Sequence, residues 1–221
     1  MKTTKARRFS FLLSILRPPL RILRPLLRSG RHRGFATVRT SCSHAIALAI
    51  LLSPLTAQAA TIHGSTDADV VWVSAPKAAP KPIEEVLTNH NRSFIPPLTV
   101  IPVGSTIRFP NEDPFFHSIY STSTPDPFDI GFYDTGPGKT VPFPNPGIIE
   151  LHCHIHASMH ATIIVADGPY AQSSNGNYAL AGVPAGKYVL HAWDLAHGEH
   201  TTTVDVPAES ADVTLDIRIS R

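Results

Sequence analysis

The sequence is poor in cysteine, with two among its 221 residues, Cys42 and Cys153. Cys42 lies in a basic N-terminal segment, so residues 60–221 hold a single cysteine. One cysteine cannot form the internal disulfide framework that stabilises many small secreted domains. It needs another reason to persist as a thiol in an oxidising compartment, and metal ligation is such a reason.

Acidic residues are absent from residues 1–59, which carry 11 of the 19 lysines and arginines. Residues 60–221 reverse this balance, with 8 basic and 17 acidic residues and a net charge of −9. An acidic chain argues against nucleic acid and against anionic lipid as partners. We expect instead that a protein partner offers a basic docking surface.

Hydrophobic runs long enough to span a bilayer are also missing. The apolar stretch His44–Thr56 is too short for that, and the small residues Ala57–Ala59 follow it. Together with the basic segment before it, this pattern predicts a cleaved secretory signal peptide over residues 1–59. The mature protein is then periplasmic and not inserted in the membrane. The alternatives are an uncleaved membrane anchor and a twin-arginine signal at Arg7–Arg8.

Long helical periodicity is absent, whereas the 21 prolines and 13 glycines are spread along the chain. Short alternating apolar segments predict strands, for example Val70–Val73, Ser105–Phe109 and Ala161–Ala166. The segment Ala75–Pro82 is rich in proline and alanine and predicts a linker or exposed loop. We predict an all-β fold in which the first strands and the C-terminal strands form one sandwich around an inserted second one.

What the sequence does contain is a dense group of metal-binding side chains, Leu-His-Cys-His-Ile-His-Ala-Ser-Met-His at residues 151–160. Cys153, His156 and Met159 form a C-x2-H-x2-M motif in a predicted loop, and His117 lies in a separate upstream loop. Two histidines, a cysteine and a weakly bound methionine are the ligand set of a type 1 (blue) copper site. We predict that His117, Cys153, His156 and Met159 bind one copper ion per chain. If Met159 is instead a core residue, His160 or a backbone carbonyl is the alternative fourth ligand.

The remaining histidines of this segment, His152, His154 and His160, cannot all join Cys153 at one metal ion, because neighbouring side chains point in different directions. His152-Cys153-His154 is similar to the core of multicopper oxidases, but the chain lacks the other His-x-His pairs of such enzymes. We expect these histidines to be exposed at the copper end, with binding of a second copper ion as the alternative.

Several segments resemble the cupredoxin pattern of plastocyanin-like proteins, and the likeness is closest to bacterial proteins of the methylamine-utilization type. The ligand loop is similar to that of amicyanin, and residues 176–193 resemble a carboxypeptidase regulatory-like (transthyretin-like) β-sandwich. The segments that carry the cupredoxin resemblance are Phe94–Pro97, Val103–Thr106, Phe109–Asp113, His117–Ser121, Phe128–Tyr133, Pro146–Gly147 and Cys153–Met159.

The resemblance implies a cupredoxin Greek-key β-sandwich over residues 89–166. A second small β-sandwich then combines residues 60–88 with residues 167–221. Cupredoxins often carry asparagine after the first histidine ligand, where it ties the two ligand loops together. This chain has Ser118 there, which leads us to expect a weaker tie, a looser site and an altered potential.

These features together predict a periplasmic electron-transfer protein rather than an enzyme. Its partner would be a periplasmic redox protein such as a dehydrogenase or a cytochrome c, docking at an apolar patch that includes Phe115 and Phe116. The alternatives are copper binding or storage without electron transfer, and a structural sandwich with a vestigial copper site. We expect four histidines elsewhere in the chain to be surface or loop residues: His90, His191, His197 and His200.

Overall fold

The structure is a computed structural model that describes residues 59–208 and 212–219. The predicted signal peptide and Cys42 therefore lie outside the described residues, apart from Ala59. No helix in the described ranges is long and apolar enough to cross a membrane.

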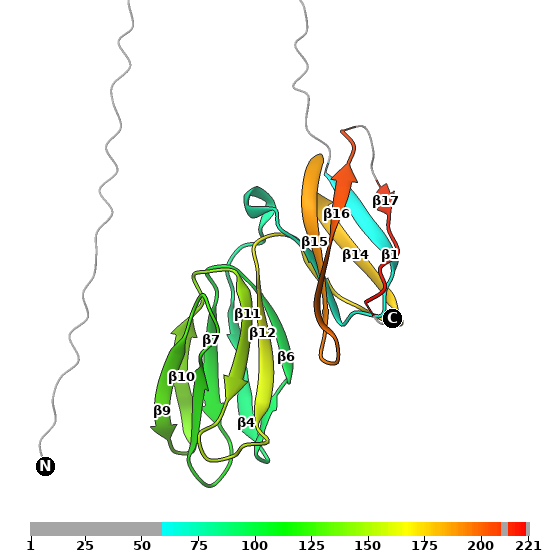
Figure 1. Ribbon diagram of the computed structural model, residues 1–221. Coiled ribbons are helices and arrows are strands. Elements are labelled where there is room, and N and C mark those ends of the chain that lie inside the picture. The colour runs from blue at the N-terminus through cyan, green and yellow to red at the C-terminus, as the bar shows by residue number, and fades with distance from the viewer. Residues whose placement is uncertain (1–58, 209–211, 220–221) are drawn as a thin grey trace, which may run out of the picture. The chain divides into compact units, whose positions relative to one another are not determined.

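The predicted all-β fold is confirmed, and the described residues contain only one short 3-10 helix, η1 (Pro76–Ala78), within the predicted linker (Figure 1). The strands are β1 Ala60–Ser65, β2 Val70–Val73, β3 Glu84–Val86, β4 Thr88–His90, β5 Ser93–Ile95, β6 Leu98–Pro102, β7 Thr106–Asn111, β8 His117–Ser121, β9 Phe128–Tyr133, β10 Gly136–Pro142, β11 Gly147–His152, β12 His160–Ala166, β13 Tyr170–Gln172, β14 Asn177–Val183, β15 Gly186–Asp194, β16 Gly198–Val206 and β17 Asp212–Thr214.

The middle of the chain forms a sandwich of two five-stranded sheets. One sheet has the order β10-β7-β4-β5, with β3 also paired to β7, and the other has the order β6-β12-β11-β8-β9. Alternation along β12 sends Ala161, Ile163 and Val165 into the core between the sheets. The core also contains Cys153 and Met159, so two of the predicted ligands are part of the hydrophobic interior.

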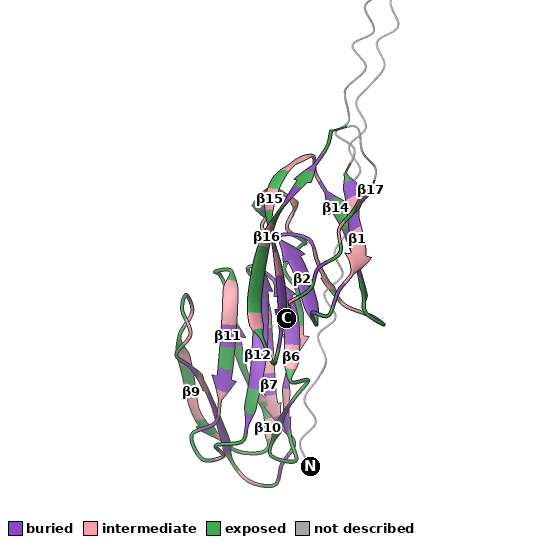
Figure 2. Ribbon diagram, turned by 45° about the vertical axis from the view of Figure 1, so that its right-hand side comes forward, coloured by how far each residue is buried: buried purple, intermediate pink, exposed green. Residues whose placement is uncertain are grey.

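The N-terminal strands belong with the C-terminal ones in a second, smaller sandwich. Strand β1 lies between β14 and β17, and β2 lies between β13 and β15 in a four-stranded sheet that β16 completes. Strand β2 is buried along its whole length, because Val71 and Val73 face this sandwich's core whereas Val70 and Trp72 pack in a separate apolar cluster (Figure 2).

The predicted boundary at residue 88 is too late. Strand β3, Glu84–Val86, pairs in parallel with β7 and is therefore part of the middle sandwich. The amide of Ile83 already donates to Ser105 Oγ at 3.0 Å. The chain thus enters the middle sandwich directly after the proline-rich linker.

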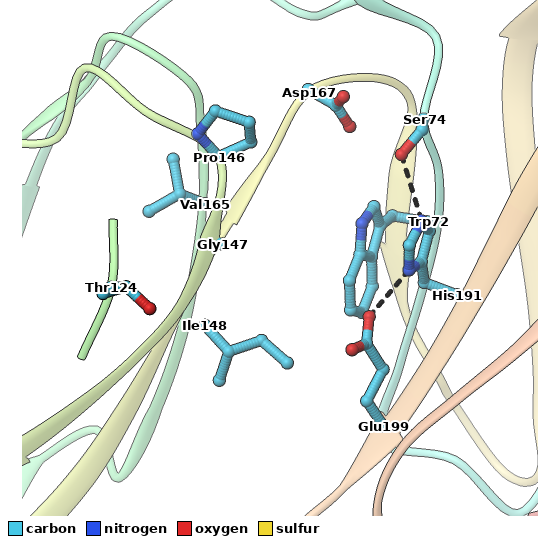
Figure 3. A pocket seen from close by; sticks show the side chains of 10 residues that line it. All are labelled: Trp72, Ser74, Thr124, Pro146, Gly147, Ile148, Val165, Asp167, His191 and Glu199. Carbon is cyan, nitrogen blue, oxygen red and sulfur yellow. Dashed lines mark hydrogen bonds and ion pairs between the residues drawn. The ribbon is translucent and has the colours of Figure 1, made fainter. Parts of the chain in front are cut away.

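One histidine of the small sandwich does not lie free at the surface as expected. His191 on β15 stacks on Trp72 with ring centroids 4.7 Å apart (Figure 3). Its Nε2 lies 3.0 Å from Ser74 Oγ and its Nδ1 lies 2.7 Å from Glu199 Oε1. His197, by contrast, lies exposed in the turn after β15, where Asp194 binds its ring. Of the four histidines expected at the surface or in loops, His191 is therefore the exception, whereas His90, His197 and His200 are exposed.

Candidate metal centre

The predicted ligands come from two neighbouring strands of one sheet. His117 is the first residue of β8, and Cys153 directly follows β11, which pairs with β8. His156 lies in the short loop between β11 and β12. That loop is closed by a hydrogen bond from the amide of Met159 to the carbonyl of His156, at 2.9 Å. Rigid strands therefore fix both segments that carry ligands.

Three of the four predicted ligand side chains converge on one point. Cys153 Sγ lies 3.9 Å from Nδ1 of His117 and 3.9 Å from Nδ1 of His156, and the two Nδ1 atoms are 3.2 Å apart. Metal–nitrogen and metal–sulfur bonds of roughly 2.0 and 2.3 Å place the ligand atoms of one ion about 3.3–3.7 Å apart. The observed triangle is close to that size. The residues present therefore fit a metal ion bound by two imidazoles and a thiolate.

Burial separates the ligands into an inner and an outer group. His117 is 0% exposed, Cys153 5% and Met159 1%, whereas His156 is half-buried. Met159 packs in the same core cluster as Cys153, next to the site, and its role as the axial ligand stays a prediction. His156 is thus the one member of the converging triad whose ring approaches solvent.

The surroundings of Cys153 favour its thiolate. Burial raises the pKa of the thiol, but hydrogen bonds from the amides of Ser118 and Ile155 and from the His117 side chain outweigh burial and lower the pKa to about 6. A thiolate is the form of cysteine that binds metals. The metal-free site therefore already favours the charged thiolate that a cation would bind.

Ser118 ties the two ligand segments together, and whether this tie is weaker than that of an asparagine stays a prediction. Its hydroxyl accepts a hydrogen bond from the backbone amide of His154 at 2.8 Å and lies 3.6 Å from Cys153 Sγ. Ser118 is fully buried, so these contacts are shielded from water. A hydroxyl is sufficient here because the β8 backbone runs close enough to the loop for the shorter side chain to reach it.

Asp113 is the residue of the site that sequence reasoning missed as a functional group. Its Oδ2 accepts from Nε2 of the buried His117 at 2.8 Å. The amides of Asn91 and Arg92 also donate to this carboxylate, at 2.7 and 2.9 Å. Burial raises the pKa of Asp113, but these amide and imidazole donors bring it below its usual value. The carboxylate therefore stays charged and fixes the His117 tautomer so that Nδ1 is free to bind a metal.

Aromatic rings cover the outer side of the triad. Phe115 lies with its ring centroid 5.2 Å from that of His117 and 5.9 Å from that of His156, and the guanidinium of Arg92 lies over it at 5.1 Å. Phe115 is half-buried and shields the histidines, whereas Phe116 is 52% exposed. Of the two phenylalanines predicted for a docking patch, only Phe116 is largely open to solvent.

Comparison with known proteins gives a consistent but distant set of likenesses. No family model matches the sequence, and no curated protein matches it. A copper-containing nitrite reductase from Thermus scotoductus SA-01 is 30% identical, covering 39% of this chain and 22% of the reductase, with a TM-score of 0.35. Amicyanin from Paracoccus versutus is 17% identical, covering 44% of this chain and 98% of amicyanin, with a TM-score of 0.34. A purple cupredoxin from Nitrosopumilus maritimus is 22% identical, covering 38% and 99% of the two chains, with a TM-score of 0.32.

The described part of the chain shows two facing five-stranded sheets, with one candidate ligand at the start of β8 and a candidate ligand loop between β11 and β12. The low TM-scores do not place the chain in any one of these protein families, and the chain spans only 22% of the nitrite reductase.

Proposed function

We propose that this chain is a periplasmic type 1 copper protein that transfers single electrons between redox partners. The observation that carries the proposal is the convergence of Cys153 Sγ with the Nδ1 atoms of His117 and His156 in a buried site. Sulfur and imidazole donors in this combination favour copper over harder ions. In the proposed site, Met159 supplies a weak fourth ligand from the adjoining core.

The ligands His117 and Cys153 suit electron transfer because hydrogen bonds hold their side chains in place. A copper ion bound there supplies a one-electron Cu(II)/Cu(I) couple. His117 is held by Asp113 on one ring nitrogen, and Cys153 is held by hydrogen bonds that involve Ser118. Because both side chains have fixed partners on the protein side, their positions change little when the charge of the site changes.

His156 is the proposed exit for the electron. The other ligands are buried, whereas His156 is half-buried and lies in the loop at the end of the sandwich. Because the other three proposed ligands are buried, we propose electron transfer without bond-making catalysis. The protein is in this view a carrier and not an enzyme.

An apolar surface beside the site is the proposed docking area for partners. Phe116 is 52%, Phe132 55% and Ile155 44% exposed. The rings of Phe116 and Phe132 meet edge to face at 5.8 Å. The net charge of −9 of residues 60–221 would steer a basic partner toward the protein in a salt-dependent way. We propose a periplasmic redox protein as this partner, either a dehydrogenase or a cytochrome c.

The test is a Cu(II) titration followed by visible absorption and EPR spectroscopy. We expect an intense thiolate-to-copper band that saturates at one equivalent and that Cys153→Ser abolishes. His154→Gln is the matched control, because His154 directly follows Cys153 but its Nε2 binds Asp129 at 3.0 Å. A colourless titration that Cys153→Ser leaves unchanged would overturn the proposal.

A further inference from the structure

A second pair of imidazoles lies near the ligand loop, on the other face of the same sheet. His152 ends β11 and His160 begins β12, and the two are direct cross-strand partners. Their strand neighbours Leu151 and Ala161 face the core, so alternation sends both histidines to the outer face. Cys153, by contrast, is in the core.

The two rings present their nitrogens to each other at short range. Nδ1 of His152 lies 3.0 Å from Nδ1 of His160, and the ring planes are nearly perpendicular at 87°. His160 is exposed and His152 is half-buried. In the part of the chain that the structure describes, neither Nε2 atom has a hydrogen-bond partner. Either ring can therefore carry its proton on Nε2 and free its Nδ1 lone pair.

We propose that His152 and His160 form a second, independent binding site for a divalent copper ion. Two nitrogens 3.0 Å apart subtend about 95° at an ion bound at the roughly 2.0–2.1 Å of metal–imidazole bonds. That angle fits adjacent corners of a tetragonal site, which is the geometry that Cu(II) prefers. Among divalent first-row ions, Cu(II) also binds nitrogen donors most tightly.

The competing role for the pair is an N–H···N hydrogen bond between neutral rings. Such a bond contributes only about 0.5–1.5 kcal/mol net. Because both rings are accessible to solvent, a metal ion can replace the shared proton without disturbing the core. The pair is therefore available to a cation even if the metal-free protein forms the hydrogen bond.

Neighbouring side chains hold the ring of His152 in place. Tyr120 is the cross-strand partner of His152 on β8, and their ring centroids are 5.4 Å apart. Tyr120 in turn stacks on His154 at 4.1 Å, and His154 binds Asp129 at 3.0 Å. This row of contacts limits the freedom of the His152 ring, which lowers the entropic cost of binding an ion.

The second site should be weaker than the cysteine site. Among the described residues, the only group of three or more histidine, cysteine or carboxylate side chains with metal-binding spacing is His117, Cys153 and His156. Two imidazoles must therefore bind the ion together with water. We expect copper to fill the cysteine site first and the histidine pair second.

The experiment titrates the purified protein with Cu(II) chloride, followed by calorimetry and EPR. We expect a second equivalent with the EPR signature of a tetragonal, nitrogen-bound Cu(II). His160→Gln removes one of two chelating ligands and should weaken the binding of that equivalent roughly 100-fold, because the second imidazole binds as an intramolecular ligand. His152→Gln should give the same result, and His200→Gln, which changes an exposed histidine on β16 of the other sandwich, should give none.

Repeating the titration in a Cys153→Ser background separates this inference from the proposed function. If His160→Gln removes one equivalent in that background too, the histidine pair binds copper whether or not the blue site exists. The inference is overturned if His160→Gln and its parent bind the same number of equivalents with the same affinities. Absence of the blue band from the copper-loaded wild-type protein would count against electron transfer and leave the histidine pair standing.

Discussion

Oδ2 of Asp113 lies 2.8 Å from Nε2 of His117, and both side chains are almost completely buried. The opposite nitrogen of the same ring, Nδ1, faces Cys153. A carboxylate behind a metal-binding histidine fixes the ring and makes it a stronger donor. Because the carboxylate carries a negative charge in a buried place, it also stabilises the more highly charged oxidation state of a metal ion beside it.

Asp113→Asn should therefore raise the reduction potential of the copper-loaded protein, because Cu(II) loses more stabilisation than Cu(I). We also expect Cu(II) affinity to fall about 10- to 100-fold, as is typical when a partner of a metal ligand is removed. Protein-film voltammetry measures the potential, and competition with a chelator measures the affinity.

Asp129→Asn is the matched control for that change. Asp129 also binds a histidine, Nε2 of His154 at 3.0 Å, but both partners are exposed. We expect little change in potential, because water screens this charge. Equal shifts in the two variants would mean that net charge, rather than the contact to His117, sets the potential.

Ser118 should be needed for the low pKa of the thiol. Ser118→Ala removes the hydroxyl that lies 3.6 Å from Cys153 Sγ and that accepts from the amide of His154. We expect a higher thiol pKa, a shifted thiolate-to-copper band and a loss of about 1–3 kcal/mol in stability from the orphaned amide. Ser121→Ala, a buried serine on the same strand whose hydroxyl accepts from the amide of Ser123, should leave the band unchanged. An unaltered band in Ser118→Ala would show that the hydroxyl does not support the site.

The metal-free protein should show an acidic thiol. The hydrogen bonds around Cys153 outweigh burial and lower its pKa from 9.0 to about 6. The thiolate therefore predominates at neutral pH and is lost as the pH falls through about 6. Thiolate absorbance in the ultraviolet, followed against pH with Cys153→Ser as the blank, measures this directly. A midpoint near 9 would contradict the hydrogen-bonding pattern of the site.

The sequence was sufficient to predict that the side chains of Cys153 and His156 lie together, because the loop that carries them is local. Cys153, His156 and Met159 follow one another at intervals of three residues between two recognisable strands, so the spacing itself indicates a shared loop. The role of Asp113 could not be predicted in the same way. It lies four residues before His117 across an irregular segment, and only the fold shows that its carboxylate turns back onto that ring.

Contacts between distant segments account for the other differences from the predictions. Ser118 ties the ligand segments because β8 and the loop after β11 lie close together. The sequence alone does not show how far apart these two segments are. His191 lies in a segment whose alternation predicts a strand, but the sequence does not show its contacts. Its partners Ser74 and Glu199 come from two other parts of the chain. The three-residue strand β3 has too little periodicity to reveal that it pairs with β7.

Met159→Leu tests whether Met159 is a ligand or only a core residue. Met159 is 1% exposed and packs with Cys153 in the core. Because Met159→Leu conserves side-chain volume, it should lower the free energy of unfolding by less than about 1.5 kcal/mol. We expect a clear change in reduction potential and in the EPR parameters, because the weak axial ligand tunes both. An unchanged potential and spectrum would make Met159 a core residue and leave a backbone carbonyl as the alternative fourth ligand, because His160 lies on the outer face of the sheet with His152.

Phe132→Ser tests the proposed docking surface without touching the site. Phe132 is 55% exposed and contacts Phe116 edge to face, so its removal should change stability by no more than about 0.5 kcal/mol. We expect slower electron exchange with a basic cytochrome c, at unchanged potential and absorption. Leu195→Ser is the matched control, because Leu195 is 79% exposed but follows β15 in the other sandwich. Equal rates for wild type and Phe132→Ser would mean that partners reach His156 by another surface, whereas equal slowing in both variants would indicate a general effect of apolar surface.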